Sequence, residues 1–121
     1  MPSAVLVVAT DALAAALLGA AVELAGYAPV FPREGETPRE ALRRSKPSVV
    51  LVDCDSEEAC GESFFGPAMM MGAGVAVFTS TRSRGALGPV AKKYGVRSFQ
   101  LPIDFGDLSA LLDACAGKPS T

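Results

Sequence analysis

The sequence predicts an α/β fold, in which a parallel sheet of five strands carries helices on both faces. Apolar runs rich in β-branched residues recur along the chain, at 4–9, 28–31, 48–53, 75–79 and 96–101. Segments with helical apolar spacing lie between them and begin at capping residues. Short connections and right-handed crossovers favour the strand order 2-1-3-4-5 for such a chain.

The central element of this prediction is the run Ser48 to Asp53. Its apolar residues follow Pro47 and end in an aspartate, as expected of a strand buried on both faces. In an open α/β sheet, the carboxyl ends of the strands form the binding crevice. The sequence therefore predicts that Asp53 lies at the rim of that crevice.

Composition narrows the possible functions of the 121 residues. The net charge of −2 gives no reason to expect binding to nucleic acid or to an anionic membrane. The chain has no histidine, which excludes Ser–His and Cys–His nucleophile pairs and predicts no enzyme. Three cysteines without CxxC spacing suit a reduced, cytoplasmic protein. One domain is expected over residues 1–117, with a frayed tail at 118–121.

The first helix is predicted from Asp11, as its cap, to about residue 25. Asp11 interrupts the apolar stretch 4–22, and the run after it is too short to span a bilayer. The face with Leu13, Leu17 and Leu24 is predicted to pack on the core. The opposite face carries no charge and would then form an exposed apolar partner surface, made of Ala15, Leu18, Gly19 and Val22.

The remaining helices are predicted from caps and prolines. Thr37 caps a helix over 38–45, and Asp104 caps the last helix. Between the third and fourth strands, one helical turn is expected at 56–60, and Pro67 is expected to open a helix through the methionines 69–71, which would fill the core. A further helix is expected within 83–94.

Over about residues 4–116, the chain resembles the response-regulator receiver domain of two-component signalling, which has a flavodoxin-like fold. The resemblance lies in VLVVATDALAAALLGAAVELAGY, EALRRSKPSVVLVD, VAVFTS and LPIDFGDLSALL. It implies that Asp53 is the phosphoacceptor and that Thr79 is the hydroxyl residue of the switch. It also implies a signalling partner, a histidine kinase or another protein, and leaves a homodimer open.

Several positions depart from the receiver pattern. Receivers place an acidic pair after the first strand to hold Mg²⁺, but this chain has Ala9 and Thr10 there, with Asp11 one residue late. Receivers carry a lysine before the proline that ends the fifth strand, and here Leu101 precedes Pro102. Asp11 and Asp53 remain weak metal candidates, and no cofactor is predicted.

Three hypotheses follow from these residues. The first is a stand-alone atypical receiver, or pseudo-receiver, that works by protein contact in a phosphorelay-type pathway. The second is a working phosphoacceptor at Asp53 with atypical metal ligation. The third is a small-molecule binder on the same frame, although Ala9-Thr10-Asp11 is not a glycine-rich phosphate loop. Each site residue also has a purely structural interpretation: Asp53 and Asp11 as caps, and Thr79 as a strand residue.

Overall fold

The computed structural model describes residues 3–53, 62–79, 96–101 and 103–116. In chain order the elements are β1 (Ala4–Val8), α1 (Ala12–Leu24), β2 (Ala28–Val30), α2 (Pro38–Ser45), β3 (Val49–Asp53), α3 (Glu62–Met70), β4 (Gly74–Thr79), β5 (Arg97–Gln100) and α5 (Phe105–Cys115). The helical turn predicted at 56–60 and the helix predicted within 83–94 lie outside the described residues. None of the described helices is long and apolar enough to cross a membrane.

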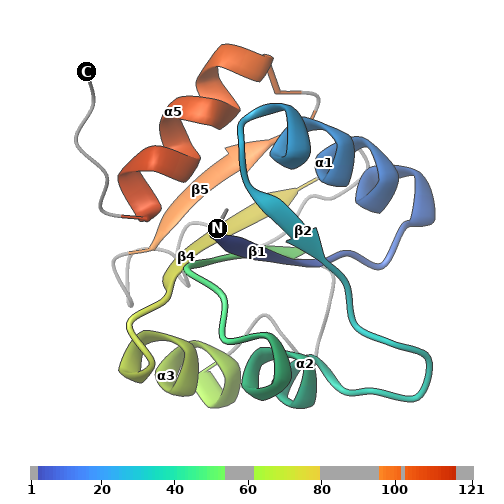
Figure 1. Cartoon of the computed structure of the whole chain (residues 1–121), viewed down its shortest axis with the longest axis vertical. Coiled ribbons are helices and arrows are strands. Elements are labelled where there is room, and N and C mark those ends of the chain that lie inside the picture. The colour runs from blue at the N-terminus through green and yellow to red at the C-terminus, as the bar shows by residue number, and fades with distance from the viewer. Residues whose placement is uncertain (1–2, 54–61, 80–95, 102, 117–121) are drawn as a thin grey trace.

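The sheet has the predicted order, β2-β1-β3-β4-β5, and all of its pairings are parallel. Helices α1 and α5 cover one face, and α2 and α3 cover the other (Figure 1). All five residues of β3 are buried, as expected of the middle strand. The outer strands are the shortest: β2 has three residues, including Pro29, and β5 has four.

Two apolar clusters form the core, one on each side of the sheet. Alternate strand residues point to opposite faces. Leu6, Val50 and Val77 therefore pack toward α2 and α3, where Phe64 and Phe65 are fully buried. Val7, Leu51, Phe78 and their neighbours pack toward α1 and α5, against a set that includes Leu18, Val22, Leu108 and Leu112. Asp53 at the end of β3 is the one buried charged residue in the described part of the chain.

The predicted orientation of α1 was wrong. Leu18, Gly19 and Val22, assigned to an exposed partner surface, are buried, and Ala15 is half-buried. Leu13, Leu17 and Leu24, assigned to the core, are 66%, 62% and 77% exposed.

The close approach of Phe31 explains this orientation of α1. A β-carbon on Gly19 would lie 2.6 Å from the Phe31 ring, so the smallest residue of the helix faces the segment after β2. Because both faces of α1 are apolar, helical periodicity did not distinguish them.

The prediction for α3 also needs correction. The helix begins at Glu62 and runs through Pro67, which therefore does not open it. Met69, Met70 and Met71 are 46%, 90% and 43% exposed, so they do not fill the core. Phe64, Phe65 and Ala68 supply the buried contacts instead. The aromatic pair is larger and stiffer than the methionines, and its burial sets the rotation of the helix.

The predicted caps are confirmed. Asp11 accepts hydrogen bonds from the first-turn amides of α1, and Asp104 accepts one from Gly106 N. Thr37 and Glu40 form a reciprocal capping box at α2, where Pro38 occupies the first turn. Lys46 ends α2 in the left-handed conformation, with φ 45°. These short-range bonds satisfy one or two of the free amides at each helix start and help to fix where the helix begins.

The contact between Tyr27 and α5 can be tested through the pH dependence of stability. Its ring is 2% exposed, and its hydroxyl donates a 2.6 Å hydrogen bond to Asp113 Oδ1 of α5. Burial and then this bond raise the pKa of Tyr27 from 10.0 to about 12. Between those two pKa values the unfolded chain loses the proton and the folded chain keeps it. The stability from Tyr27 is therefore fully present below pH 10 and is lost as the pH rises toward 12.

We expect the stability difference between the native protein and Tyr27→Phe to shrink as the pH is raised through this interval. Urea unfolding of both proteins at several pH values between 9 and 12 measures it. A stability difference that stays constant or grows with pH would contradict the raised pKa of Tyr27.

Candidate functional site

The candidate site lies at the carboxyl ends of the middle strands. Asp53 ends β3 and is only 5% exposed. Its Oδ2 accepts two hydrogen bonds from Thr10, one from the backbone N at 3.1 Å and one from Oγ1 at 2.7 Å. Hydrogen bonds to an ionised carboxylate are stronger than those between neutral groups. Thr10 therefore holds Asp53 in a defined orientation.

The sheet register brings Thr10 and Asp53 together. Strands β1 and β3 are neighbours, with Val8 opposite Val52. The chain leaves β1 at Ala9 and turns at Thr10 before α1 begins, so the Thr10 amide faces the end of β3. From the sequence, Thr10 was identified only as a residue that replaces an expected acid. A threonine can donate hydrogen bonds both from its amide and from its hydroxyl, and this property could have predicted the contact with Asp53.

Asp11 has a structural role in this site. Its Oδ1 accepts from Leu13 N and its Oδ2 from Ala14 N, each at 3.4 Å. The side chain is exposed and serves as the N-cap of α1. Within the described ranges, no group of three or more His, Cys, Asp or Glu residues could hold a metal ion.

The backbone also brings Thr79 to this edge of the sheet. Asp53 pairs with Phe78 of β4, and Thr79 is the next and last residue of that strand. Thr79 in turn pairs with Gln100 of β5, directly before Leu101. The strand ends that carry Asp53, Thr79 and Leu101 are therefore neighbours, as the parallel topology requires. Whether Thr79 acts as a switch stays a prediction.

A groove between α1 and α5 was missed by the sequence analysis. It has a volume of about 500 Å³ and a mostly apolar lining, with Asp11 as the one charged residue among the described residues that line it. Its walls include Leu13 and Leu17 of α1 and Phe105 of α5, which are 66%, 62% and 46% exposed. Leu101, at the position of the expected lysine, also lines this groove. The lack of charge on α1 could have predicted an exposed apolar surface here. The prediction placed that surface on the face with Leu18 and Val22, which is buried.

Comparison with solved structures identifies the fold as that of response-regulator receiver domains. A response regulator receiver protein from Burkholderia phymatum superposes with a TM-score of 0.78 at 18% identity, covering 99% of this chain and 98% of that one. The signal receiver domain of a modulated diguanylate cyclase from Desulfovibrio desulfuricans G20 gives 0.76 at 22% identity, covering 97% and 95%. A response regulator from Thermotoga maritima gives 0.74 at 20%, covering 98% and 100%. Comparison of the sequence with protein-family models and with curated proteins found no match.

The contribution of the Thr10 hydroxyl to the free energy of unfolding, through its hydrogen bond to Asp53, can be measured. Thr10→Val removes the hydroxyl but keeps the shape, and we expect it to lower the free energy of unfolding by about 1.5 kcal/mol. This is the low end for a charged acceptor, because Thr10 is exposed and water can replace part of the bond. Urea unfolding measures the loss, and Thr10→Ser, which keeps the hydroxyl, is the matched control. Equal losses in both variants would show that the hydroxyl contributes nothing.

Proposed function

We propose that this chain is an atypical receiver domain that signals through contact with a partner protein and does not accept a phosphoryl group at Asp53. The observation that carries the proposal is the pair of hydrogen bonds from Thr10 to Asp53 Oδ2. Thr10 stands where the receiver resemblance implies a metal-binding acid. A neutral donor thus occupies the carboxylate oxygen that a metal ion would otherwise contact.

The chemistry of phosphoryl transfer supports this proposal. The transferred group carries charge on its oxygens, which metal ions and cationic side chains must neutralise. Leu101 supplies no cation, and its side chain lines the apolar groove. Removing one preorganised donor typically costs about 3–4 kcal/mol at a transition state. The loss of both metal anchors and of the lysine therefore predicts a reaction slowed by many orders of magnitude.

The proposed partner is a signalling protein that recognises the constant shape of the domain. Under this proposal the domain is cytoplasmic and uses no cofactor. Its fold supports a signalling role because solved receiver domains share it over nearly their whole length. Asp53 then has a structural function, in which it fixes the turn after β1.

Mass spectrometry after incubation with acetyl phosphate and Mg²⁺ tests the proposal. We expect no stable adduct on Asp53. A gain of about 80 Da that is absent in Asp53→Asn would overturn it and establish the alternative, a working phosphoacceptor with atypical metal ligation. Ala9→Asp, Thr10→Asp and Leu101→Lys together restore the implied acid pair and lysine. This triple variant should begin to take up phosphate if those losses cause the inactivity.

A further inference from the structure

We infer that the surface formed by the ends of α2 and α3 binds an acidic segment of a partner protein that also carries apolar side chains. The inference rests on the proposed signalling by protein contact. Helices α2 and α3 contact each other on the opposite face of the sheet from α1 and α5 (Figure 1). Two features of this surface carry the inference: a cationic row on α2, made of Arg39, Arg43 and Lys46, and a methionine patch at the end of α3, made of Met69, Met70 and Met71.

The cationic row follows one flank of α2. Its members succeed each other at i, i+4 and i+7, so they lie on one side of the helix over roughly 10 Å. All three are exposed, and no residue that the structure describes forms an ion pair or hydrogen bond with their side chains. Glu40, the one acid of the helix, accepts from Thr37 N at the helix start. The C-terminus of α2 contributes roughly half a negative charge, which leaves the row positive.

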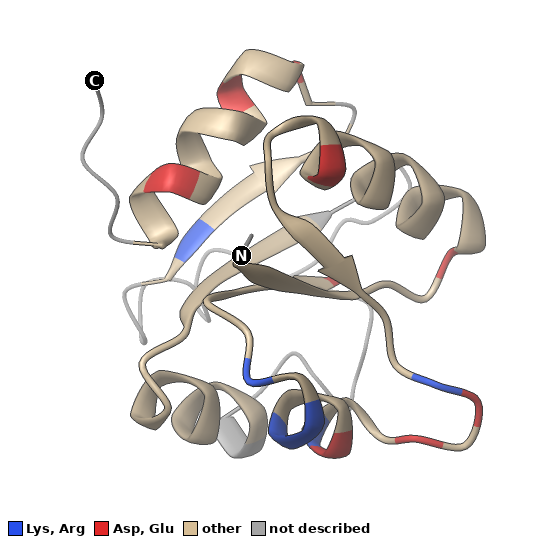
Figure 2. Ribbon diagram, in the orientation of Figure 1, with Lys and Arg blue, Asp and Glu red and all other residues tan. Residues whose placement is uncertain are grey.

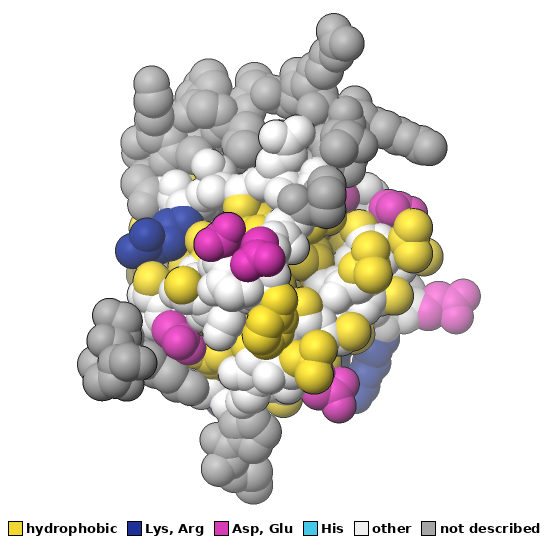
Figure 3. Space-filling view, turned by 90° about the horizontal axis from the view of Figure 1, so that it is seen from above, with side chains coloured by type: hydrophobic (Ala, Val, Ile, Leu, Met, Phe, Trp, Pro, Cys, Tyr) yellow, Lys and Arg dark blue, Asp and Glu magenta, His cyan; other side chains and the backbone are white. Residues whose placement is uncertain are grey.

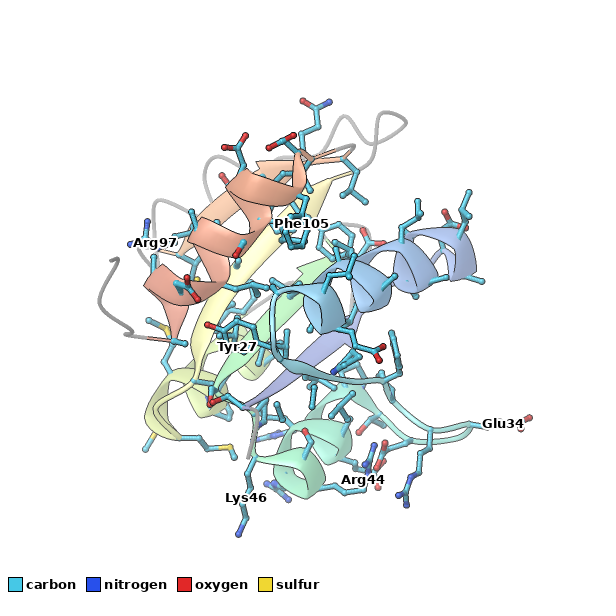
Figure 4. All side chains as sticks on the ribbon, turned by 45° about the horizontal axis from the view of Figure 1, so that its top comes forward. Tyr27, Glu34, Arg44, Lys46, Arg97 and Phe105 are labelled. Carbon is cyan, nitrogen blue, oxygen red and sulfur yellow. The ribbon has the colours of Figure 1, made fainter. Side chains whose placement is uncertain are left out.

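Arg44 shows which way this row faces. Its Nη2 donates to Phe31 O, directly after β2, at 3.2 Å, so the Arg44 flank of α2 faces β2. The members of the cationic row lie about 100–160° around the helix axis from Arg44, all in the same direction. Because α2 packs on β1 and α3 on β4, which is further from β2, this other flank faces α3. Figure 4 shows Lys46 on the α3 side of α2 and Arg44 on the other side.

The methionine patch lies at the end of α3 that is close to the cationic row. All three of its side chains are exposed, and Met70, the last residue of the helix, is 90% exposed. Helices α2 and α3 lead into the neighbouring strands β3 and β4, where Gly74 N donates to Ser48 O at 2.9 Å. Lys46 and Met71 lie two and three residues before this contact. The two helix ends therefore lie together.

Cations beside exposed methionines define the chemistry of the partner. Methionine has a flexible, polarisable side chain that adapts to apolar surfaces of different shape, and it is enriched in protein interfaces. Lys and Arg form charge-assisted hydrogen bonds with carboxylates. A segment that carries Asp or Glu next to apolar residues matches both features of the surface.

The distribution of charge over the domain favours an acidic partner at this place. The basic residues of α2 lie below the sheet in Figure 2. Every charged residue of α1, α5 and their N-caps is acidic, and Figure 3 shows acidic side chains on that side of the molecule. An acidic segment is therefore repelled from one face of the domain and attracted to the other, which determines the face that it contacts.

Two other occupants fit this surface less well. Membranes recognise clusters of roughly four to eight Lys and Arg, whereas the cationic row has three, and the apolar Ala41 and Leu42 of α2 are buried and do not reach a membrane. A second copy would offer its acidic α1–α5 side. That contact joins two different surfaces, so it would build open chains of copies unless they close into a ring.

The surface is separate from the site around Asp53. The cationic row and the methionine patch come before the starts of β3 and β4, at Val49 and Gly74. Asp53 lies at the other end of β3, roughly 13 Å away along the strand. Binding at the ends of α2 and α3 therefore leaves the carboxyl ends of the strands free.

The test uses two synthetic peptides of roughly 18 residues, long enough to form a helix on binding. Both carry leucine at every third or fourth position; one has glutamate at the other positions, and the matched control has lysine. Fluorescence anisotropy measures affinity, and amide chemical shifts locate the binding site. We expect saturable binding of the glutamate peptide, weaker at high salt, with shifts confined to α2, the end of α3 and the starts of β3 and β4. The lysine peptide should not shift these amides.

Matched variants of the domain test the two features separately. Arg43→Glu should weaken binding of the glutamate peptide at least about tenfold. The same charge change at Arg33 should have little effect, because Arg33 precedes Glu34, which lies far from Lys46 in Figure 4.

Met70→Ser should weaken binding at least about fivefold. Leu24→Ser is its control, since Leu24 is also the last residue of its helix and is 77% exposed, but lies on α1. Binding by this variant should be unchanged. Circular dichroism establishes that each variant is folded.

Several results would overturn the inference: no saturable binding of the glutamate peptide up to about 1 mM, shifts centred on α1 and α5, or unchanged binding by Arg43→Glu or Met70→Ser. Binding to vesicles of phosphatidylserine and phosphatidylcholine that Arg43→Glu abolishes would assign the surface to a membrane instead. Self-association in sedimentation that Arg43→Glu dissolves would assign it to a second copy.

The outcome is separate from that of the proposed function. Phosphorylation of Asp53 would end that proposal without altering the peptide titration, because the two sites lie at opposite ends of β3. A failed titration would leave the mass-spectrometric result standing.

Discussion

Replacing Leu18 by alanine should lower the free energy of unfolding by about 2–5 kcal/mol, the usual cost of truncating a fully buried leucine. Leu18 is 2% exposed and packs between α1 and the face of the sheet that also holds Val7 and Leu51. Leu18→Glu should be more damaging still, because it would bury a charged group within a cluster of apolar side chains. A domain of this size has roughly 5–15 kcal/mol of stability, so the glutamate variant is expected to be largely unfolded.

The neighbouring Leu17 provides the matched control for this experiment. It has the same side chain and the same helix propensity, but it is 62% exposed. Leu17→Ala and Leu17→Glu should change the free energy of unfolding by less than about 0.5 kcal/mol. Urea denaturation followed by circular dichroism measures all four variants. Similar losses at both positions, or a larger loss at Leu17, would contradict the orientation of α1.

Gly74→Val is expected to have the second large effect. Gly74 begins β4 and lies against the end of α5, where a β-carbon would overlap the carbonyl oxygen of Cys115. The carbonyl carbon would be 2.8 Å away and the Cys115 β-carbon 2.9 Å away. The overlap involves the backbone of α5, which cannot rotate aside as a side chain does. Overpacking of this kind costs about 1–3 kcal/mol or more, and we expect at least 2 kcal/mol here.

Gly66→Ala in α3 is the control for Gly74. Among the residues that the structure describes, nothing lies within 4 Å of a β-carbon at Gly66, and the φ of Gly66 is not positive. Alanine should therefore stabilise the helix by about 0.5–1 kcal/mol. Urea denaturation compares the two variants. Gly74→Val with the stability of the native protein would show that β4 and α5 are not in this contact.

The fold was predictable because its signals are local or strongly periodic. The apolar residues 49–52 before Asp53 form a short run that is mostly valine, which favours a strand buried on both faces. Asp11, Thr37 and Asp104 were predictable as caps, since each bonds to amides within three residues. Right-handed crossovers then leave few arrangements of five parallel strands.

What could not be predicted depended on tertiary packing. The two faces of α1 are both apolar, and they are distinguished by tertiary contacts: Leu18 and Val22 pack in the core, and Gly19 faces Phe31. In α3, the phenylalanines are buried and the methionines exposed, although both types are apolar. In the site, the position of Asp53 followed from its strand, but its bonds with Thr10 span 43 residues and depend on the pairing of β1 with β3.

The two outer strands also bear on how the protein avoids aggregation. An unpaired sheet edge can pair with the edge of another chain and so start fibres. Here β2 is three residues long and contains Pro29, which has no N–H to donate, and β5 is short and carries the exposed Arg97. Short strands, proline and charge all discourage such pairing. Contacts between this domain and other proteins are therefore expected to form through helix surfaces, which leave the sheet intact and can dissociate without unfolding.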